Sequence, residues 1–299
     1  MNQIPFKRSL SFEYGKAANL SPLIRRVIAK NPSMFTLYGT GTYIIGKGNV
    51  AIIDPGPNIP EHIKAVLDAV QGETVTDILI THTHIDHSPA TPHVKAATGA
   101  TTWGFGPHGT KDTGEQVEEG ADYDFVPDQI LRDNTIVKGD GWTFESIHTP
   151  GHTSNHICLV LREENVMFSG DHVMGWSTSV ISPPDGDMGA YLQSLNKLLA
   201  RKEIRYWPTH GPAIEEPQDF VQAFIGHREK REENILTCLK DGISQIPQIV
   251  EQLYTSIDPK LYGAAGRSVL AHLTHMLETG RVICDEKPTV NSSFRPSGR

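Results

Sequence analysis

Three histidines and an aspartate fall within six positions of one short segment, THTHIDHSPA, which runs from residue 81 to 90. His82 and His84 are two positions apart and can point the same way, whereas Asp86 and His87 follow where the chain turns. Imidazole and carboxylate groups are ligands of zinc, and manganese or iron(II) also accepts such a set of nitrogen and oxygen atoms. The spacing suits two adjacent metal ions better than one.

Two adjacent ions need more ligands than this segment supplies, because a pair about 3.5–4 Å apart requires six or seven, including an anionic bridge that offsets the repulsion. Further candidates lie downstream in loop-like settings: His152 in HTPGHTSNH, Asp171 in FSGDHVMG and His210 in YWPTHGP. The neighbouring Gly and Pro residues favour tight turns that aim a side chain inward. The sequence therefore predicts a dinuclear site built from seven residues.

The elements around the first segment place its histidines on a loop between a strand and a helix. VTDILIT from Val75 is typical of a short buried strand, and the apolar spacing before it predicts a helix that begins near residue 60. Ser88 resembles an N-cap and Gly99 a terminator, which predicts a second helix over about 89–98. Loops at the carboxyl ends of strands are where α/β proteins position their sites.

The order of strands and helices predicts a sandwich of two mixed sheets with helices on the outer faces. We expect a hairpin at a sheet edge within residues 34–53 and a loop or flap over the Gly- and acid-rich stretch 104–140. Further strands are WTFESIH, HICLVL, VMFSG and RYWPTH, with a helix over about 188–200. From about residue 215 charged helices and a final extended stretch predict a small helical domain with a β-wing.

The metal-ligand motifs resemble those of the metallo-β-lactamase superfamily, since H-x-H-x-D-H at 82–87 is followed by His, Asp and His in the family's order. The resemblance covers roughly residues 30–215 and implies that family's αββα sandwich. It also implies two divalent metal ions, zinc first and manganese or iron as alternatives. The implied ligands are His82, His84 and His152 for one ion, Asp86, His87 and His210 for the other, and Asp171 as the bridge.

The segment 170–195 and the tail resemble the lactamase-like protein 2 subgroup, whose members carry a C-terminal winged-helix domain. We therefore predict a catalytic domain over residues 1–215 and a winged-helix-like domain over residues 216–299. One member of that subgroup is a single-strand endoribonuclease. The tail is expected to serve either pocket closure or dimerisation, which would give a homodimer.

The implied mechanism is attack by a metal-bridging hydroxide on a carbonyl carbon or a phosphorus. Asp86 is the expected catalytic residue, because one of its oxygens could orient the nucleophile or accept its proton. True β-lactamases commonly replace the bridging aspartate and are exported, whereas this chain keeps Asp171 and shows no signal-peptide core in residues 1–30. The redox-active di-iron branch typically has Glu where His84 stands. Antibiotic hydrolysis and electron transfer are therefore disfavoured.

The leading hypothesis is a hydrolase that cleaves an ester, lactone or thioester of a small molecule. Its rivals are a metal-dependent single-strand endoribonuclease and a non-enzymatic scaffold. A net charge of −8 and a tail with balanced charges disfavour nucleic acid as a partner, and the complete ligand set argues against a scaffold. Because no apolar run is long enough to cross a bilayer, we expect a cytoplasmic protein without a membrane partner.

Several other residues near the motifs have competing interpretations. His148, His156 and His172 could each support a ligand or play a structural part. Asp54 could likewise support a ligand or form a turn, and the turn is slightly favoured. Trp176 is a candidate for the substrate pocket, and Tyr191 is expected to pack within a core. We expect surface or packing roles for the remaining histidines, His62, His93, His108, His227, His272 and His275, and free thiols at Cys158, Cys238 and Cys284.

Overall fold

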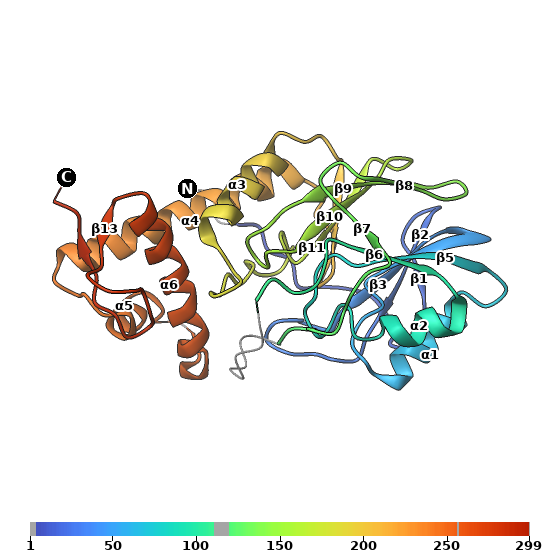
Figure 1. The fold of residues 1–299 in the computed structure, drawn as a ribbon, viewed down its shortest axis with the longest axis horizontal. Helices are drawn as coiled ribbons and strands as arrows, with labels where there is room; N and C mark the ends of the chain where they lie inside the picture. The colour runs from blue at the N-terminus through green and yellow to red at the C-terminus, as the bar shows by residue number, and fades with distance from the viewer. Residues whose placement is uncertain (1–3, 111–119, 256, 299) are drawn as a thin grey trace.

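The computed structural model describes residues 4–110, 120–255 and 257–298. Two β-sheets lie face to face, with helices outside each sheet and a helical tail to one side (Figure 1). The first sheet has seven strands in chain order, β1 (Ala18–Asn19), β2 (Ile24–Ile28), β3 (Gly41–Lys47), β4 (Asn49–Ile53), β5 (Thr74–Leu79), β6 (Thr101–Gly104) and β7 (Gln129–Ile130). The second has the order β12 (Arg205–Pro208), β11 (Val166–Gly170), β10 (Ile157–Leu161), β9 (Thr143–His148) and β8 (Ile136–Lys138).

Both sheets contain parallel and antiparallel pairs, as predicted. Strands β1 to β4 pair antiparallel and β4 to β7 parallel. In the second sheet only β11 and β12 are parallel among the described strands. Helices α1 (Pro60–Ala69) and α2 (Thr91–Thr98) cover the outer face of the first sheet, and α3 (Met188–Leu199) covers that of the second. The predicted sandwich is therefore confirmed.

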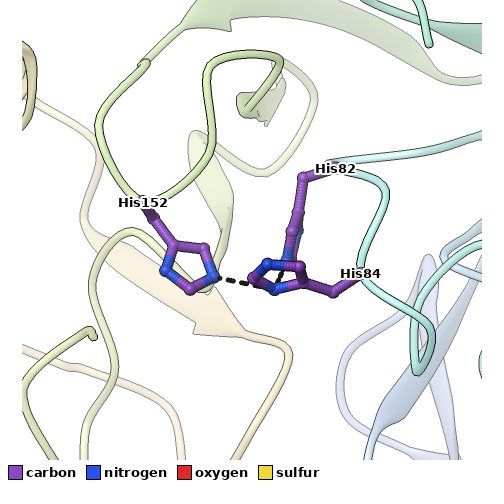
Figure 2. A group of neighbouring side chains, drawn as sticks. All are labelled: His82, His84 and His152. Atoms are coloured by element: carbon purple, nitrogen blue, oxygen red, sulfur yellow. Dashed lines mark hydrogen bonds between the residues drawn. The ribbon is translucent and has the colours of Figure 1, made fainter. Parts of the chain in front are cut away.

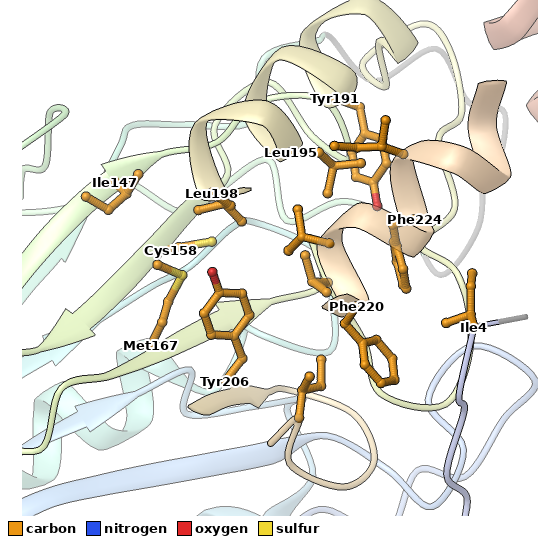
Figure 3. Packing of buried hydrophobic residues seen from close by; sticks show 14 of the residues in the cluster. Ile4, Ile147, Cys158, Met167, Tyr191, Leu195, Leu198, Tyr206, Phe220 and Phe224 are labelled. Carbon is orange, nitrogen blue, oxygen red and sulfur yellow. The ribbon is translucent and has the colours of Figure 1, made fainter. Parts of the chain in front are cut away.

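Alternation along the strands creates three apolar layers. Ile44 and Ile52 face α1 and α2, whereas Tyr43 and Ile45 point into the layer between the sheets. Side chains on a strand alternate between its two faces, so a strand buried on both faces is apolar throughout. On the outer face of the second sheet, residues of α3 and of the first half of α4 (Pro217–Lys240) pack over β10 to β12 (Figure 3).

Two expectations about local structure need correction. The hairpin β3–β4 lies in the middle of its sheet rather than at an edge, because β2 pairs with β3 on the other side. The second helix begins at Thr91, since the Ser88 hydroxyl donates to Asp122 Oδ2 at 2.6 Å instead of capping the helix. The described part of the stretch 104–140 has little regular structure, as expected, with the end of β6 and the short strands β7 and β8. Its residues 111–119 lie outside the described part of the chain.

The tail contains the three predicted helices and a small wing. Helices α4, α5 (Ile246–Leu253) and α6 (Tyr262–Glu278), with the short 3₁₀ helix Pro259–Leu261, are followed by the antiparallel pair β13 (Val282–Ile283) and β14 (Arg295–Pro296). The tail has an apolar core of its own. Helix α4 belongs to both units, because Phe220 and Phe224 lie in the core of the second sheet whereas Ile235 and Leu239 lie in that of the tail. The domain boundary at 215/216 stays a prediction.

One edge of the sandwich gathers the loops that carry the candidate ligands. Strands β5, β9, β11 and β12 end at Leu79, His148, Gly170 and Pro208. The candidate ligands follow each strand end within a few residues, so both sheets contribute to one site. Among the described residues no helix is long and apolar enough to span a membrane.

Candidate metal centre

Three imidazole rings converge at the edge of the sandwich (Figure 2). His82 Nε2 lies 3.1 Å from His84 Nδ1, and His152 Nε2 lies 3.2 Å from the same atom. Two nitrogen ligands of a tetrahedral zinc ion, each 2.0–2.1 Å from the metal, are roughly 3.3 Å apart. Both distances to His84 Nδ1 are close to that separation, and the three nitrogens lie within 4.8 Å of one another.

A second group, formed by Asp86, His87 and His210, lies beside the first. Asp86 Oδ2 lies 3.4 Å from His87 Nε2 and 3.3 Å from His210 Nε2. All three side chains are buried. Among the described residues, His87 Nε2 has no hydrogen-bond partner although it faces two carboxylates. A buried nitrogen with that environment fits a metal ligand.

Asp171 lies between the two groups. Its Oδ2 is 3.2 Å from His210 Nε2, 3.7 Å from His87 Nε2 and 3.9 Å from His152 Nε2. Its other oxygen, Oδ1, is buried and lacks a hydrogen-bond partner within the described chain. The carboxylate thus reaches atoms of both groups, and a buried unpaired oxygen is costly unless a cation binds there. The residues present fit a pair of divalent ions.

The outer nitrogens of the rings are held by groups behind the site. His87 Nδ1 donates to Asp54 Oδ2 at 3.0 Å, His152 Nδ1 donates to the Val180 carbonyl at 2.7 Å, and His210 Nδ1 contacts the Gly39 carbonyl at 3.3 Å. A donor hydrogen on Nδ1 leaves the Nε2 lone pair pointing into the site. The backbone and Asp54 therefore fix both the tautomer and the aim of these ligands.

Charge is concentrated in the second group. Burial opposes a charged imidazole, but the carboxylates of Asp171 and Asp86 outweigh it and raise the pKa of His210 to about 10. Burial likewise opposes ionisation of Asp171, yet His210 and His87 hold its pKa well below the usual range. The two carboxylates thus attract positive charge, which protons or metal cations can supply. Metal binding would displace protons from these imidazoles.

The structure also decides between the interpretations of nearby residues. His156 supports Asp171, because its Nε2 accepts a hydrogen bond from the Asp171 backbone N–H at 3.2 Å. His148 instead contacts the Ser154 carbonyl, and His172 packs against Tyr191 with ring centroids 4.6 Å apart. Tyr191 is buried in the core, as predicted.

The interpretation of Asp54 as a turn former is incomplete. Its φ of 48° does place it in a left-handed turn. Its carboxylate also accepts hydrogen bonds from the Thr81 N–H at 2.8 Å, the Thr81 hydroxyl at 2.7 Å and His87 Nδ1 at 3.0 Å. Asp54 therefore connects the backbone before His82 to the ring of His87.

Sequence reasoning missed the place of His108. Its Nδ1 lies 3.0 Å from the Thr83 hydroxyl, between His82 and His84, and its ring centroid is 6.3 Å from that of His84. The sheet topology could have revealed its position. His108 follows β6, which runs parallel to β5, so the loops after both strands meet at the same sheet edge. His108 supports the first motif from behind through Thr83.

A hollow opens beside the first group. It is bounded by His84, His152 and Asp171, and its other lining residues are Met34, Phe35, Met174, Trp176, Ser177, Thr178 and Val180. Trp176 lies in this wall, as the sequence suggested. Five of these seven further residues are apolar, and the described residues that line the hollow include no lysine or arginine.

Replacing Asp54 with Asn is expected to lower metal affinity by roughly 10- to 100-fold, the usual cost of removing a group that orients a metal ligand. The amide is about the size of the carboxylate but loses the negative charge that holds the His87 Nδ1 hydrogen. Titration with a chelating indicator measures the affinity. Asp77→Asn is the matched control, because the Asp77 carboxylate accepts from Trp103 Nε1 in the same sheet, away from the rings. Equal affinities in the two variants would contradict the role of Asp54.

Comparison with known proteins gives two family matches. Residues 36–210 match the metallo-beta-lactamase superfamily, and residues 246–288 match the beta-lactamase associated winged helix domain. The second match agrees with the predicted winged helix.

Individual relatives agree with these matches. A beta-lactamase-like protein 2 homolog from Drosophila melanogaster is 31% identical over 274 residues, covering 88% of this chain and 90% of the relative. An atrochrysone carboxyl ACP thioesterase from Aspergillus fumigatus is 32% identical over 228 residues, covering 74% of this chain and 66% of the relative.

Solved structures share the fold. A beta-lactamase domain protein from Burkholderia ambifaria superposes with a TM-score of 0.76 at 18% identity, covering 94% of both chains. A metallo-beta-lactamase family protein from Thermus thermophilus gives a TM-score of 0.75 at 20% identity, covering 93% of this chain and all of that one. Both similarities include the tail as well as the sandwich, given these coverages.

Proposed function

The chain belongs to the metallo-β-lactamase superfamily and is a hydrolase, and from this premise we propose that it cleaves an ester, lactone or thioester bond of a small molecule. The proposed cofactor is a pair of divalent ions, zinc first. We assign the ligands of the two ions as the sequence motifs implied: His82, His84 and His152 for the first, Asp86, His87 and His210 for the second, and Asp171 for both.

Our choice of substrate class rests on the hollow beside the proposed metal ions. Met34, Phe35, Met174, Trp176 and Val180 offer an apolar surface next to the first group of histidines. An uncharged acyl group suits such a wall, whereas a polynucleotide is held chiefly by Lys and Arg against its phosphates. Relatives named ACP thioesterases support acyl transfer to water. A thioester is therefore the first bond to test.

Residues around the proposed ions have distinct roles in the proposed hydrolysis. When bound, divalent ions supply a nucleophile from water near neutral pH and stabilise negative charge on the scissile carbonyl. Asp86 is proposed to orient the attacking water or accept its proton. The Thr40 hydroxyl donates to Asp86 Oδ2 at 2.7 Å and so fixes the carboxylate. Asp171 and His152 form the side of the site that meets the hollow, where the acyl group would lie.

A salt titration on a substrate panel separates this proposal from a nuclease. We expect turnover of the best thioester, lactone or ester to change little between low and moderate KCl. Binding of an uncharged substrate releases no counterions, so it does not depend on salt in this way. A nuclease that holds a single strand should lose affinity with a log–log slope of about 0.7 per phosphate contact. The panel therefore includes single-stranded RNA at each salt concentration.

His84→Ala serves as the control for contamination, since any activity of this site should depend on it. Efficient RNA cleavage that falls steeply with salt and disappears in His84→Ala would establish the nuclease and refute our proposal. The cytoplasmic location and the homodimer expected from the sequence stay predictions.

A further inference from the structure

An irregular segment that lines the hollow with Thr178 and Val180 contacts two of the proposed ligands. The Ser179 hydroxyl is within hydrogen-bonding distance of the main-chain carbonyls of Asp171, at 2.6 Å, and His172, at 2.8 Å. The next residue, Val180, accepts the hydrogen bond from His152 Nδ1. Residues 178–182 are neither helix nor strand. The position of this segment therefore decides how Asp171 and His152 are aimed.

The segment is held from outside the site by Arg228, which lies in the middle of α4. The guanidinium donates to the Ser179 carbonyl. It also lies over the Tyr191 ring, 5.2 Å from the centroid, and the Tyr191 hydroxyl donates to the His172 carbonyl at 2.8 Å. One arginine thus contacts the segment directly at Ser179, and it contacts Tyr191, which holds the backbone next to Asp171 at His172.

The environment of Arg228 makes this contact a strong constraint. The side chain is buried, and within the described residues its guanidinium forms no ion pair with a carboxylate and its Nε lacks a hydrogen-bond partner. A hydrogen bond from a charged donor is about twice as strong as a neutral one. The Ser179 carbonyl and the Tyr191 ring thus both help to compensate the buried charge.

The position of Arg228 depends on the tail. One helical turn after it, buried Glu232 pairs with His275 Nδ1 at 2.8 Å and with Arg281 at 2.6 Å, both beyond α4. Helix α4 also contributes apolar side chains to the core of the second sheet (Figure 3) and to that of the tail. Because the helix is continuous from Pro217 to Lys240, packing of the tail sets its register and hence the place of Arg228.

We propose that Arg228 is a positioning residue through which the tail fixes the backbone at Ser179–Val180 and thereby aims His152 and Asp171 at the metal ions. This inference rests on the proposed metal site. It gives the winged-helix domain a part in the chemistry that needs no contact with substrate: the tail holds the ligand segment in place.

The test compares Arg228→Met with a control on the same helix. Arg231 also lies over a tyrosine, 4.1 Å from the Tyr254 centroid, and donates to a backbone carbonyl, that of Leu253 at 3.4 Å, but it faces the tail. In the full-length protein, Arg228→Met should weaken Co²⁺ affinity by roughly 10- to 100-fold and change the visible absorption of bound Co²⁺. It should lower kcat more than it raises KM. Arg231→Met should retain wild-type affinity and spectrum.

Ser179→Ala provides a second variant in case Arg228→Met does not fold. It removes the contacts to the Asp171 and His172 carbonyls and leaves Arg228 intact, and it too should weaken Co²⁺ affinity and alter the spectrum. Wild-type affinity and spectrum in whichever of these two variants folds would overturn the inference, as would equal weakening in Arg231→Met. If the inference about Arg228 fails but the wild-type chain binds two Co²⁺ ions, the proposed metal site is still supported. A wild-type chain that binds no Co²⁺ would refute that site itself.

Discussion

Asp171→Ala is expected to release metal from the protein and to lower turnover by more than the roughly 10- to 100-fold that follows loss of a residue supporting a ligand. Asp171 Oδ2 lies near nitrogens of both groups, and Oδ1 has no other partner among the described residues. Removing this carboxylate would leave the proposed ions without the anion that offsets their repulsion. Elemental analysis of the purified variant and steady-state kinetics on the best substrate measure both effects.

The kinetic pattern distinguishes this role from substrate binding. A group that acts on the nucleophile and the transition state lowers kcat and kcat/KM together, whereas loss of uniform binding raises KM alone. We therefore expect kcat of Asp171→Ala to fall far more than KM rises. Asp171→Asn should show an intermediate loss, because the amide can still offer one oxygen but no charge.

Glu203→Ala is a suitable control for Asp171→Ala. Glu203 is also buried, but it pairs with Arg201 at 2.7 Å, before the strand that leads to His210. Its removal should lower thermal stability and leave the metal content unchanged. Wild-type metal content and turnover in Asp171→Ala would show that the bridge is assigned to the wrong residue.

The sequence predicted which residues gather at the candidate metal centre better than it predicted the groups around them. His82, His84, His152 and Asp171 could be found because their chemistry stands out at the ends of apolar strands. The support from Asp54 was one of two interpretations that the sequence left open, since its partner His87 lies 33 positions away and the contact depends on the parallel pairing of β4 and β5. Residue type and local spacing carry no information about such pairings.

Local structure differs from prediction where a distant contact competes with a local preference. Ser88 has the type and position of an N-cap, but its hydroxyl binds Asp122 and the helix begins at Thr91. The sequence predicted the hairpin β3–β4 at a sheet edge, and no strand was predicted at the position of β2, whose sequence is IRRVI. Arg26 is nevertheless buried in β2 and donates to the Gly211 carbonyl beside His210. Tertiary contacts overrode propensity in both places.

Fully loaded protein is expected to contain two metal ions per chain, and exhaustive chelation is expected to abolish hydrolysis. The reason is the division of the seven residues into two sets with Asp171 between them. If only the set of His82, His84 and His152 held an ion, the buried Asp86 carboxylate would face His87 and His210 without a metal cation. Elemental analysis after purification without chelator gives the count, and addition of Zn²⁺, Mn²⁺ or Fe²⁺ to the chelated protein identifies the ions that restore activity.

Chelation should also lower the melting temperature, because the ions bind the folded chain. A ligand present at 100 times its Kd stabilises the folded state by about 2.7 kcal/mol. Each kcal/mol corresponds to roughly 2–4 °C in chains of 150–250 residues and to less in longer chains, so each ion should contribute about 4 °C in a chain of 299 residues. His84→Ala should lose the part of this shift that belongs to the first ion and keep the rest. A wild-type chain that is fully active with one ion under metal-replete conditions would contradict the dinuclear assignment, because the second set would then have no part in the reaction.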